Sequence, residues 1–206
     1  MNRSSRTTAL AALLVAVAAL GGCASVAVMS HIPISTMSRL SALKIADIDP
    51  ELLRVAARLP EILEPRRDGV KVRIDVKGSG IYGGSTLEFI LEAVIDSAEL
   101  APLSAHRRAR FQLWIYRFSP RDIERLRRFI ADRGDAFSVS IAVGVDACWR
   151  NPVGSAALPT TTFLKTDATG FFVLAEDLDL RSVVSDRDLT TKIPPCSRNS
   201  VEGYRM

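Results

Sequence analysis

Hydrophobic and polar residues alternate along several stretches of the chain, and this pattern predicts β-strands. In the clearest stretch, residues 69–78, every second residue is valine or isoleucine and most of the residues between them are charged. The same alternation predicts strands over residues 110–118 and 137–145, and a hairpin around residues 167–170. Residues 110–118 are apolar on both faces, so we expect that strand to be covered on both sides.

One segment carries the signals of an amphipathic helix, over about residues 120–132. Ser119 is suited to cap the helix, Pro120 to occupy its first position, and Gly134 to end it. The apolar side consists of Ile123, Leu126 and Ile130.

Two segments, residues 50–59 and 86–96, fit both a helix and a strand. For residues 86–96 the alternation, followed by a turn and another strand, favours a strand over the helix that Ser85 and Glu88 would cap. Together these patterns predict an α+β fold, a mainly antiparallel or sandwich-like sheet domain with one clear helix. We place that domain at residues 41–196, followed by a flexible tail over residues 197–206.

The first residues have three zones: a short positive stretch with Arg3 and Arg6, an apolar run over residues 9–20, and Gly21-Gly22-Cys23. This order is typical of an export signal. Leu20-Gly21-Gly22-Cys23 resembles the lipobox of bacterial lipoprotein precursors.

The resemblance implies that residues 1–22 are removed and that Cys23 carries a diacylglycerol thioether, with acyl chains of the palmitate type. Two or three chains anchor a protein almost permanently. Ala24 follows the cysteine, which favours the outer over the inner membrane of the bacterial envelope, with the protein facing the periplasm. Residues 23–40 would then be a membrane-proximal segment. The alternative is an uncleaved membrane-spanning helix over about residues 9–29, since residues 7–38 contain no charged side chain.

Composition narrows the range of partners. Removing the leader leaves 184 of the 206 residues, enough for one domain with a core. Without Arg3 and Arg6 the chain has 25 basic and 23 acidic residues, a balance that does not favour nucleic acid. We therefore expect contacts with the membrane and with envelope proteins or peptidoglycan, and no nucleic acid.

Two cysteines remain in the domain, Cys148 and Cys196. An even number in an oxidising compartment favours a disulfide. The alternative, a redox or metal pair, lacks a Cys-x-x-Cys spacing and a histidine nearby in sequence.

Catalytic signals are few. His106 is the one histidine of the domain, and we interpret it as a turn residue because no nucleophile motif accompanies it. The glycines of residues 77–86 lack the lysine of a phosphate loop and favour a loop at a sheet edge. No residue set favours a cofactor or a metal, and no catalytic residue can be named. A hydrolase that uses two carboxylates stays open as the alternative to a binding or structural role.

Two features favour a binding surface. Trp114, Tyr116 and Phe118 share one face of a predicted strand, unless the following helix covers them. The second feature is a set of arginines, which would contact lipid headgroups or carboxylates unless they form only a solvated helix face. These are Arg107, Arg108, Arg110, Arg121, Arg125 and Arg128.

Overall fold

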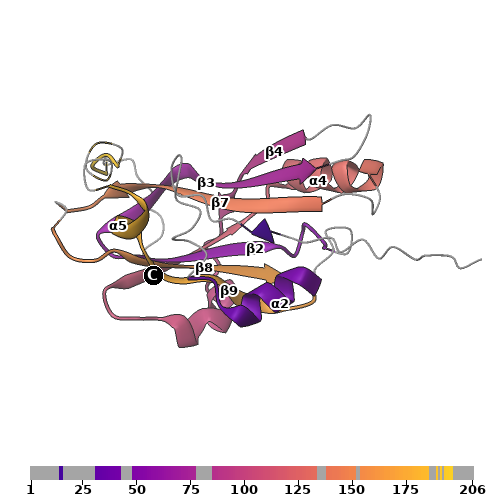
Figure 1. Cartoon of the computed structure of the whole chain (residues 1–206). Coiled ribbons are helices and arrows are strands. Elements are labelled where there is room, and N and C mark those ends of the chain that lie inside the picture. The colour runs from indigo at the N-terminus through magenta and orange to yellow at the C-terminus, as the bar shows by residue number, and fades with distance from the viewer. Residues whose placement is uncertain are drawn as a thin grey trace, which may run out of the picture.

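The protein is built mostly of antiparallel β-sheet, arranged in two layers with short helices around them (Figure 1). The computed structural model describes residues 14–15, 31–42, 48–77, 85–133, 138–151, 154–185, 189, 191 and 193–196. Its strands are β1 (Leu14–Val15), β2 (Arg54–Pro60), β3 (Leu63–Lys77), β4 (Ser85–Ile90), β5 (Glu92–Ala93), β6 (Phe111–Arg117), β7 (Ser138–Trp149), β8 (Pro159–Thr166) and β9 (Gly170–Asp179). Its helices are α2 (Ile34–Ala42), α3 (Ser97–Leu100), the 3₁₀ helix η2 (Ala101–His106), α4 (Pro120–Arg133) and α5 (Leu180–Val183).

The first layer, sheet A, has the strand order β1-β7-β3-β4. Its long pair β3–β7 is antiparallel, and its register shifts between Pro65 and Val70. Within that shift Asp68 has a positive φ of 57°, which marks a bulge. β1, which lies in the predicted signal peptide, pairs in parallel with β7 at Ser140 and Ile141.

The second layer, sheet B, has the order β5-β6-β2-β8-β9, and all of its pairs are antiparallel. The chain crosses from sheet B to sheet A through the short turn between β2 and β3. It returns to sheet B with β5 and β6, enters sheet A again with β7, and ends in sheet B with the β8–β9 hairpin. The two sheets therefore share the chain from its middle to its end, and neither is a separate unit.

The main hydrophobic core lies between the two sheets. From sheet A it takes the alternating Val70, Val72, Ile74 and Val76. Sheet B contributes the inward-facing side chains of β2, β6, β8 and β9, among them Val55, Ala57, Leu59, Leu164 and Leu174. Helix α4 packs on this core through Ile123, Leu126, Phe129 and Ile130.

The outer face of sheet B carries a second, smaller core. Ala56, Ile115 and Phe163 form it together with Leu103 of η2, which is fully buried. Helix α3 and η2 therefore cover this face. β6 is buried on both faces over residues 114–116 and half-buried over residues 111–113, so its sequence prediction holds for the middle of the strand.

The two edges of sheet B differ. The edge strand β9 is covered by the segment before and within α2: the backbone nitrogen of Glu176 donates to the carbonyl of His31 over 2.9 Å, and Thr36 Oγ1 donates to the carbonyl of Val173. On the other side β5 pairs with β6 only at Arg117 and Tyr116. The rest of β6 has no strand beside it on that side among the described residues.

Most of the elements predicted from the sequence are present. Strands occupy the predicted ranges near residues 69–78, 110–118 and 137–145, and the hairpin turns at residues 167–169. Both ambiguous segments are strands, β2 and the pair β4 and β5. Residues 43–47 and 197–206 lie outside the described residues.

Within the part of the chain that the structure describes, no helix is long and apolar enough to cross a membrane. The leader and Cys23 lie outside that part, apart from Leu14 and Val15.

Candidate functional site

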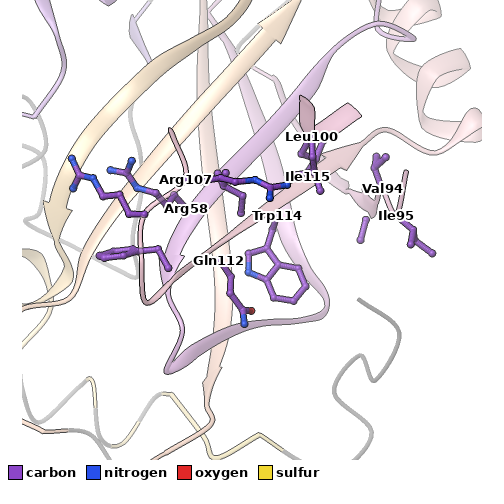
Figure 2. Close-up of a pocket in the computed structure, with 12 residues that line it drawn as sticks. Arg58, Val94, Ile95, Leu100, Arg107, Gln112, Trp114 and Ile115 are labelled. Carbon is purple, nitrogen blue, oxygen red and sulfur yellow. The ribbon is translucent and has the colours of Figure 1, made fainter. Parts of the chain in front are cut away.

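A groove of about 300 Å³ runs along the free edge of β6. Five consecutive residues of β6, from Phe111 to Ile115, line it together with the segment 93–95 and Leu100. Figure 2 shows Arg58 and Arg107 toward one side and Val94, Ile95 and Leu100 toward the other, with Gln112 and Trp114 between. Consecutive residues of a strand point to opposite faces, so the groove straddles the edge of the sheet.

One wall of the groove is basic. Arg58, Arg107 and Arg108 line it, and the described lining residues include no aspartate or glutamate. Arg107 and Arg108 follow η2 and are exposed, whereas Arg58 lies within β2 and its side chain is only 4% exposed.

Arg58 is held in place by several partners. Its Nη1 donates to the carbonyl of His106 over 3.0 Å, and its Nη2 donates to Thr161 Oγ1 over 2.8 Å and to Asp177 Oδ1 over 2.7 Å. Its guanidinium also lies 5.7 Å from the ring centroid of Phe111. Buried guanidinium groups need such partners because desolvation of the charge is costly.

The third nitrogen of the Arg58 guanidinium group, Nε, lacks the partners that the two terminal nitrogens have. It is buried and has no hydrogen-bond partner among the described residues. A buried polar atom of this kind costs free energy unless a ligand or water satisfies it. Arg58 therefore has a buried donor beside the groove, which can donate to an anionic or carbonyl oxygen that reaches it.

Asp177 is the acid closest to this wall. Arg108 Nη1 donates to both of its carboxylate oxygens, over 3.0 and 2.9 Å. Burial acts to raise the pKa of Asp177, but hydrogen bonds and charge from Arg108 and Arg58 outweigh it and hold that pKa below its usual 3.8. Asp177 therefore stays ionised and offsets one of three guanidinium charges, which leaves the wall positive.

The predicted aromatic row is buried. Trp114, Tyr116 and Phe118 are 8%, 5% and 1% exposed and belong to the core between the sheets. The row is therefore covered, but by the core between the two sheets rather than by the following helix alone, and the three side chains do not form an exposed aromatic surface. Trp114 alone also contributes to the lining of the groove.

The predicted arginines divide between two places. Arg107 and Arg108 line the groove, and Arg110 occupies the adjacent turn with a φ of 64°. The three on α4 lie elsewhere and are exposed. Arg125 donates to the carbonyl of Glu88 over 3.1 Å and lies over the Phe89 ring, and Arg128 pairs with Glu124 along the helix. Arg121 is at the start of the same helix.

The sequence reasoning missed Arg58. It lies in one of the two ambiguous segments, and the strand pattern alone would have placed its side chain opposite the main core. A buried arginine on that face needs a cover, and η2 and its loop supply one that no periodicity indicates. The signal available was a charged residue between two apolar ones in a strand, which usually means exposure.

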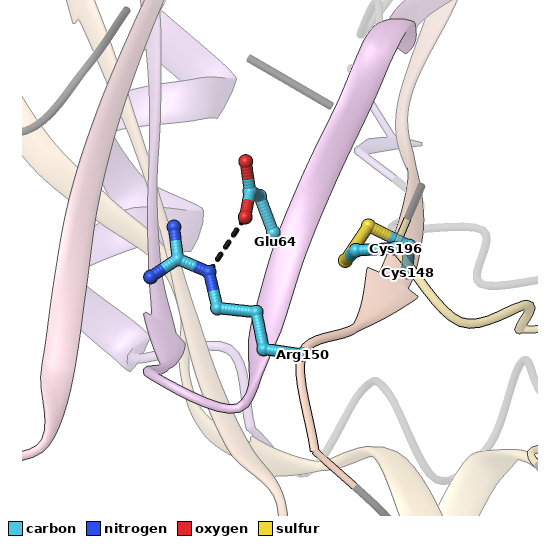
Figure 3. Close-up of a disulfide and its surroundings, with 4 residues drawn as sticks. All are labelled: Glu64, Cys148, Arg150 and Cys196. Atoms are coloured by element: carbon cyan, nitrogen blue, oxygen red, sulfur yellow. Dashed lines mark hydrogen bonds and ion pairs between the residues drawn. A yellow bond between two sulfur atoms is a disulfide. The ribbon is translucent and has the colours of Figure 1, made fainter. Parts of the chain in front are cut away.

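A second hollow lies near the disulfide. Cys148 and Cys196 form the predicted bond, with Cα atoms 4.9 Å apart (Figure 3). Glu61, Glu64 and Arg150 line the hollow beside them. Glu64 is nearly buried, and its Oε2 accepts from Arg150 Nε over 2.6 Å. That carboxylate is therefore neutralised by a fixed guanidinium.

His106 ends η2, and its ring centroid lies 4.8 Å from that of Phe163. This position agrees with a structural turn residue that packs on the sheet. The glycine-rich residues 78–84 lie outside the described residues. Among the side chains that are described, no group of three or more His, Cys, Asp or Glu residues is arranged to hold a metal ion.

No protein-family model, curated protein or solved structure matches this chain.

Proposed function

We propose that this chain is a lipid-anchored protein of the bacterial cell envelope with a binding role, and that it contacts its partner through the groove along β6. The observation that carries the proposal is the buried, partly unpaired Arg58 beside Arg107 and Arg108, next to an apolar wall. Such sites combine apolar area for affinity with a few placed charges for specificity.

The position of the groove suits an anchored protein. The segment that follows the predicted anchor is held against β9, at the opposite edge of sheet B from β6. Three strand intervals separate β6 from β9, which is about 14 Å. The groove would therefore be turned away from the anchored side and be accessible to a partner.

The tether would be short. Eight residue steps join Cys23 to His31, so an extended chain spans at most about 28 Å between them. His31 is already fixed to the domain through Glu176. We therefore expect the domain to stay close to the membrane and to recruit a partner to that surface.

The first experiment is cross-linking of the full chain, with an affinity tag, in intact cells of a Gram-negative host. After detergent extraction, mass spectrometry identifies the retained molecules and the N-terminal peptide of the protein. We expect an acylated peptide that begins at Cys23 and an envelope partner whose recovery falls severalfold in Arg107→Gln. Arg73→Gln, an exposed arginine on sheet A, is the matched control. An acylated protein without a partner, or equal recovery in both variants, would contradict the proposal.

A small envelope hydrolase is the second candidate. It is favoured by the hollow that contains Glu61 and Glu64, since glycoside hydrolysis needs two carboxylates. The fixed pair of Glu64 with Arg150 disfavours it. Release of soluble fragments from purified cell-wall sacculi that disappears in both Glu61→Gln and Glu64→Gln would support this candidate.

A further inference from the structure

We infer that the free edge of β6 binds an extended peptide segment of a partner protein as an added antiparallel strand, with the peptide's terminal carboxylate at Arg58, Arg107 and Arg108. This inference rests on the proposed binding role and specifies the chemistry of the ligand.

The edge of β6 presents main-chain groups to the groove. β5 pairs with β6 at Arg117 and Tyr116, and the backbone nitrogen of Val94 then donates to the carbonyl of Ile115 over 2.8 Å. Alternate residues of an antiparallel strand direct their backbone groups to the same side. The amide and carbonyl of Leu113 therefore face the groove, where no strand lies beside them among the described residues.

The adjacent chain leaves the sheet at this point. After Val94 it turns into α3, whose N-terminus is capped by the side chain of Asp96. An incoming peptide would take the place that a longer β5 would have filled. Unpaired edges are sites at which another chain adds a strand.

The direction of the added strand places its carboxylate at the basic wall. β5 runs antiparallel to β6, toward the Phe111 end. A peptide that continues in this direction has its C-terminus beside Phe111, and the ring of Phe111 lies under the guanidinium of Arg58. Arg107 and Arg108 line the same groove. A carboxylate accepts charge-assisted hydrogen bonds from such groups, which are stronger than neutral ones.

The rest of the groove fits side chains better than a headgroup. Val94, Ile95, Leu100 and Leu113 contribute apolar surface, and Ile95 is 56% exposed. A free phosphate or a lipid headgroup would use the arginines and leave this surface and the β6 backbone in water. An extended peptide contacts the arginines, the apolar surface and the β6 backbone together. Its alternate side chains contact the two faces of the sheet edge while its main chain pairs with β6.

The other edge of sheet B shows what a covered edge looks like in this protein. Residues 31–36 form hydrogen bonds to the backbone of β9 at Val173 and Glu176. The chain covers one edge with its own backbone and leaves the other lined by arginines. This difference between the two edges favours the view that the β6 edge binds a ligand over the view that it is left uncovered without a role.

The test uses the full chain in detergent micelles and a displayed library of random seven-residue peptides with free C-termini. We expect selected peptides to alternate apolar and polar residues. Amidation of the terminal carboxylate, or Arg107→Gln in the protein, should weaken binding about tenfold or more. Arg73→Gln should leave it unchanged.

N-methylation of the synthetic peptide tests the strand itself without altering the protein. We expect methylation of the one peptide amide opposite Leu113 to abolish binding and methylation of its two neighbours to have a small effect, since the amide of Phe111 already donates to the carbonyl of Arg108. Affinity that is indifferent to amidation and to the position of the methyl group would overturn the inference.

The same binding assay distinguishes a partner peptide from other ligands that the groove could hold. Binding of inorganic phosphate, of vesicles with anionic lipid or of muropeptides in place of library peptides, lost in Arg107→Gln, would overturn strand addition. Peptide binding that occurs only after deletion of residues 197–206 would assign the groove to the chain's own tail. If peptides fail while cells still yield an Arg107-dependent partner, this inference fails and the proposed function stands; if both fail, both are wrong.

Discussion

Arg58 connects stability and binding at the scale of single residues. Its two terminal nitrogens bind His106, Thr161 and Asp177, while its Nε stays unpaired at the groove. The first set fixes the guanidinium in a defined place. The guanidinium is therefore a fixed charge beside the groove, and little side-chain entropy remains to be lost when a ligand binds.

We predict that Arg58→Met lowers the free energy of unfolding by about 2–4 kcal/mol, because the part-buried carbonyl of His106 and the buried Thr161 hydroxyl lose a charged donor. Urea unfolding measures the change. Arg73→Met is the control: Arg73 forms an exposed pair with Asp75, and its loss should cost less than about 1 kcal/mol. Equal losses in the two variants would show that Arg58 does not hold this network together.

Asp177 predicts a dependence of stability on pH. A carboxyl whose pKa is lower in the folded than in the unfolded chain stabilises the fold fully above its unfolded pKa, near 3.8. This contribution is lost as the pH falls through the folded pKa. Asp177→Asn should therefore be less stable than the wild type above about pH 5, and the difference should shrink toward pH 3.

Asparagine is the suitable replacement because Asp177 has a φ of 45°, and asparagine tolerates that left-handed region. Urea unfolding of both proteins at a series of pH values between 6 and 3 measures the difference. A constant difference over that range would contradict the assignment of the pH effect to this carboxylate.

At the scale of elements, the shape of β3 depends on its bulge. The register with β7 shifts between Pro65 and Val70, and Gly69 lies inside that shift. A Cβ at Gly69 would lie 2.7 Å from the carbonyl oxygen of Asp146 and 2.9 Å from that of Arg66. Backbone atoms of two paired strands cannot move apart cheaply.

Gly69→Ala should therefore lower the free energy of unfolding by about 1–3 kcal/mol, because the added methyl group forces the bulge open. Gly154→Ala is the matched control, since a Cβ there meets no atom within 4 Å among the described residues. We expect a change of less than about 0.5 kcal/mol at that position. Thermal unfolding of the two variants measures the difference in stability. Equal unfolding midpoints would contradict the prediction that a methyl group at Gly69 clashes with the paired strands.

The elements also show what the sequence can and cannot predict. Strands such as β3 and β7 are predictable because one face is buried and the other wet, so polarity follows the pleat. Residues 54–60 were ambiguous because most of β2 is buried on both faces, and the pattern then carries little periodicity. The arginine groove could not be predicted as a site, since it depends on β5 ending after two residues.

At the scale of the whole molecule, the disulfide joins the end of β7 to the segment that follows α5. Cys196 is 48 residues from Cys148, and its backbone nitrogen donates to the carbonyl of Trp149. The indole nitrogen of Trp149 donates to the carbonyl of Leu189 over 3.3 Å. The bond and these hydrogen bonds therefore hold Leu189 and residues 194–196 against the end of β7.

Replacing both cysteines by serine in a Cys23→Ser background should lower the free energy of unfolding by about 2–4 kcal/mol, because the unfolded chain regains the freedom of a long loop. Trp149 should also become more exposed, which shifts its fluorescence to longer wavelengths. Unchanged stability and emission would show that the chain end is held without the bond.

The sequence predicted this pairing from two remaining cysteines together with an export signal, and it predicted the sheet-rich fold. A sandwich-like stacking of two sheets was one of the arrangements that the sequence predicted, whereas the covering of one edge by residues 31–36 was not predicted, because it depends on a contact between distant segments. Anchoring through Cys23 remains a prediction.

The central claim is that a partner binds in the β6 groove while the protein is in the envelope. The most direct measurement places a photo-cross-linking residue at Ile95, on the rim of the groove, and a second at Ile90 of β4 as a control of similar exposure. After irradiation of intact cells, we expect a discrete cross-linked partner from Ile95, lost in Arg107→Gln, and none from Ile90. Equal cross-linking from both positions, or none from Ile95, would contradict the claim.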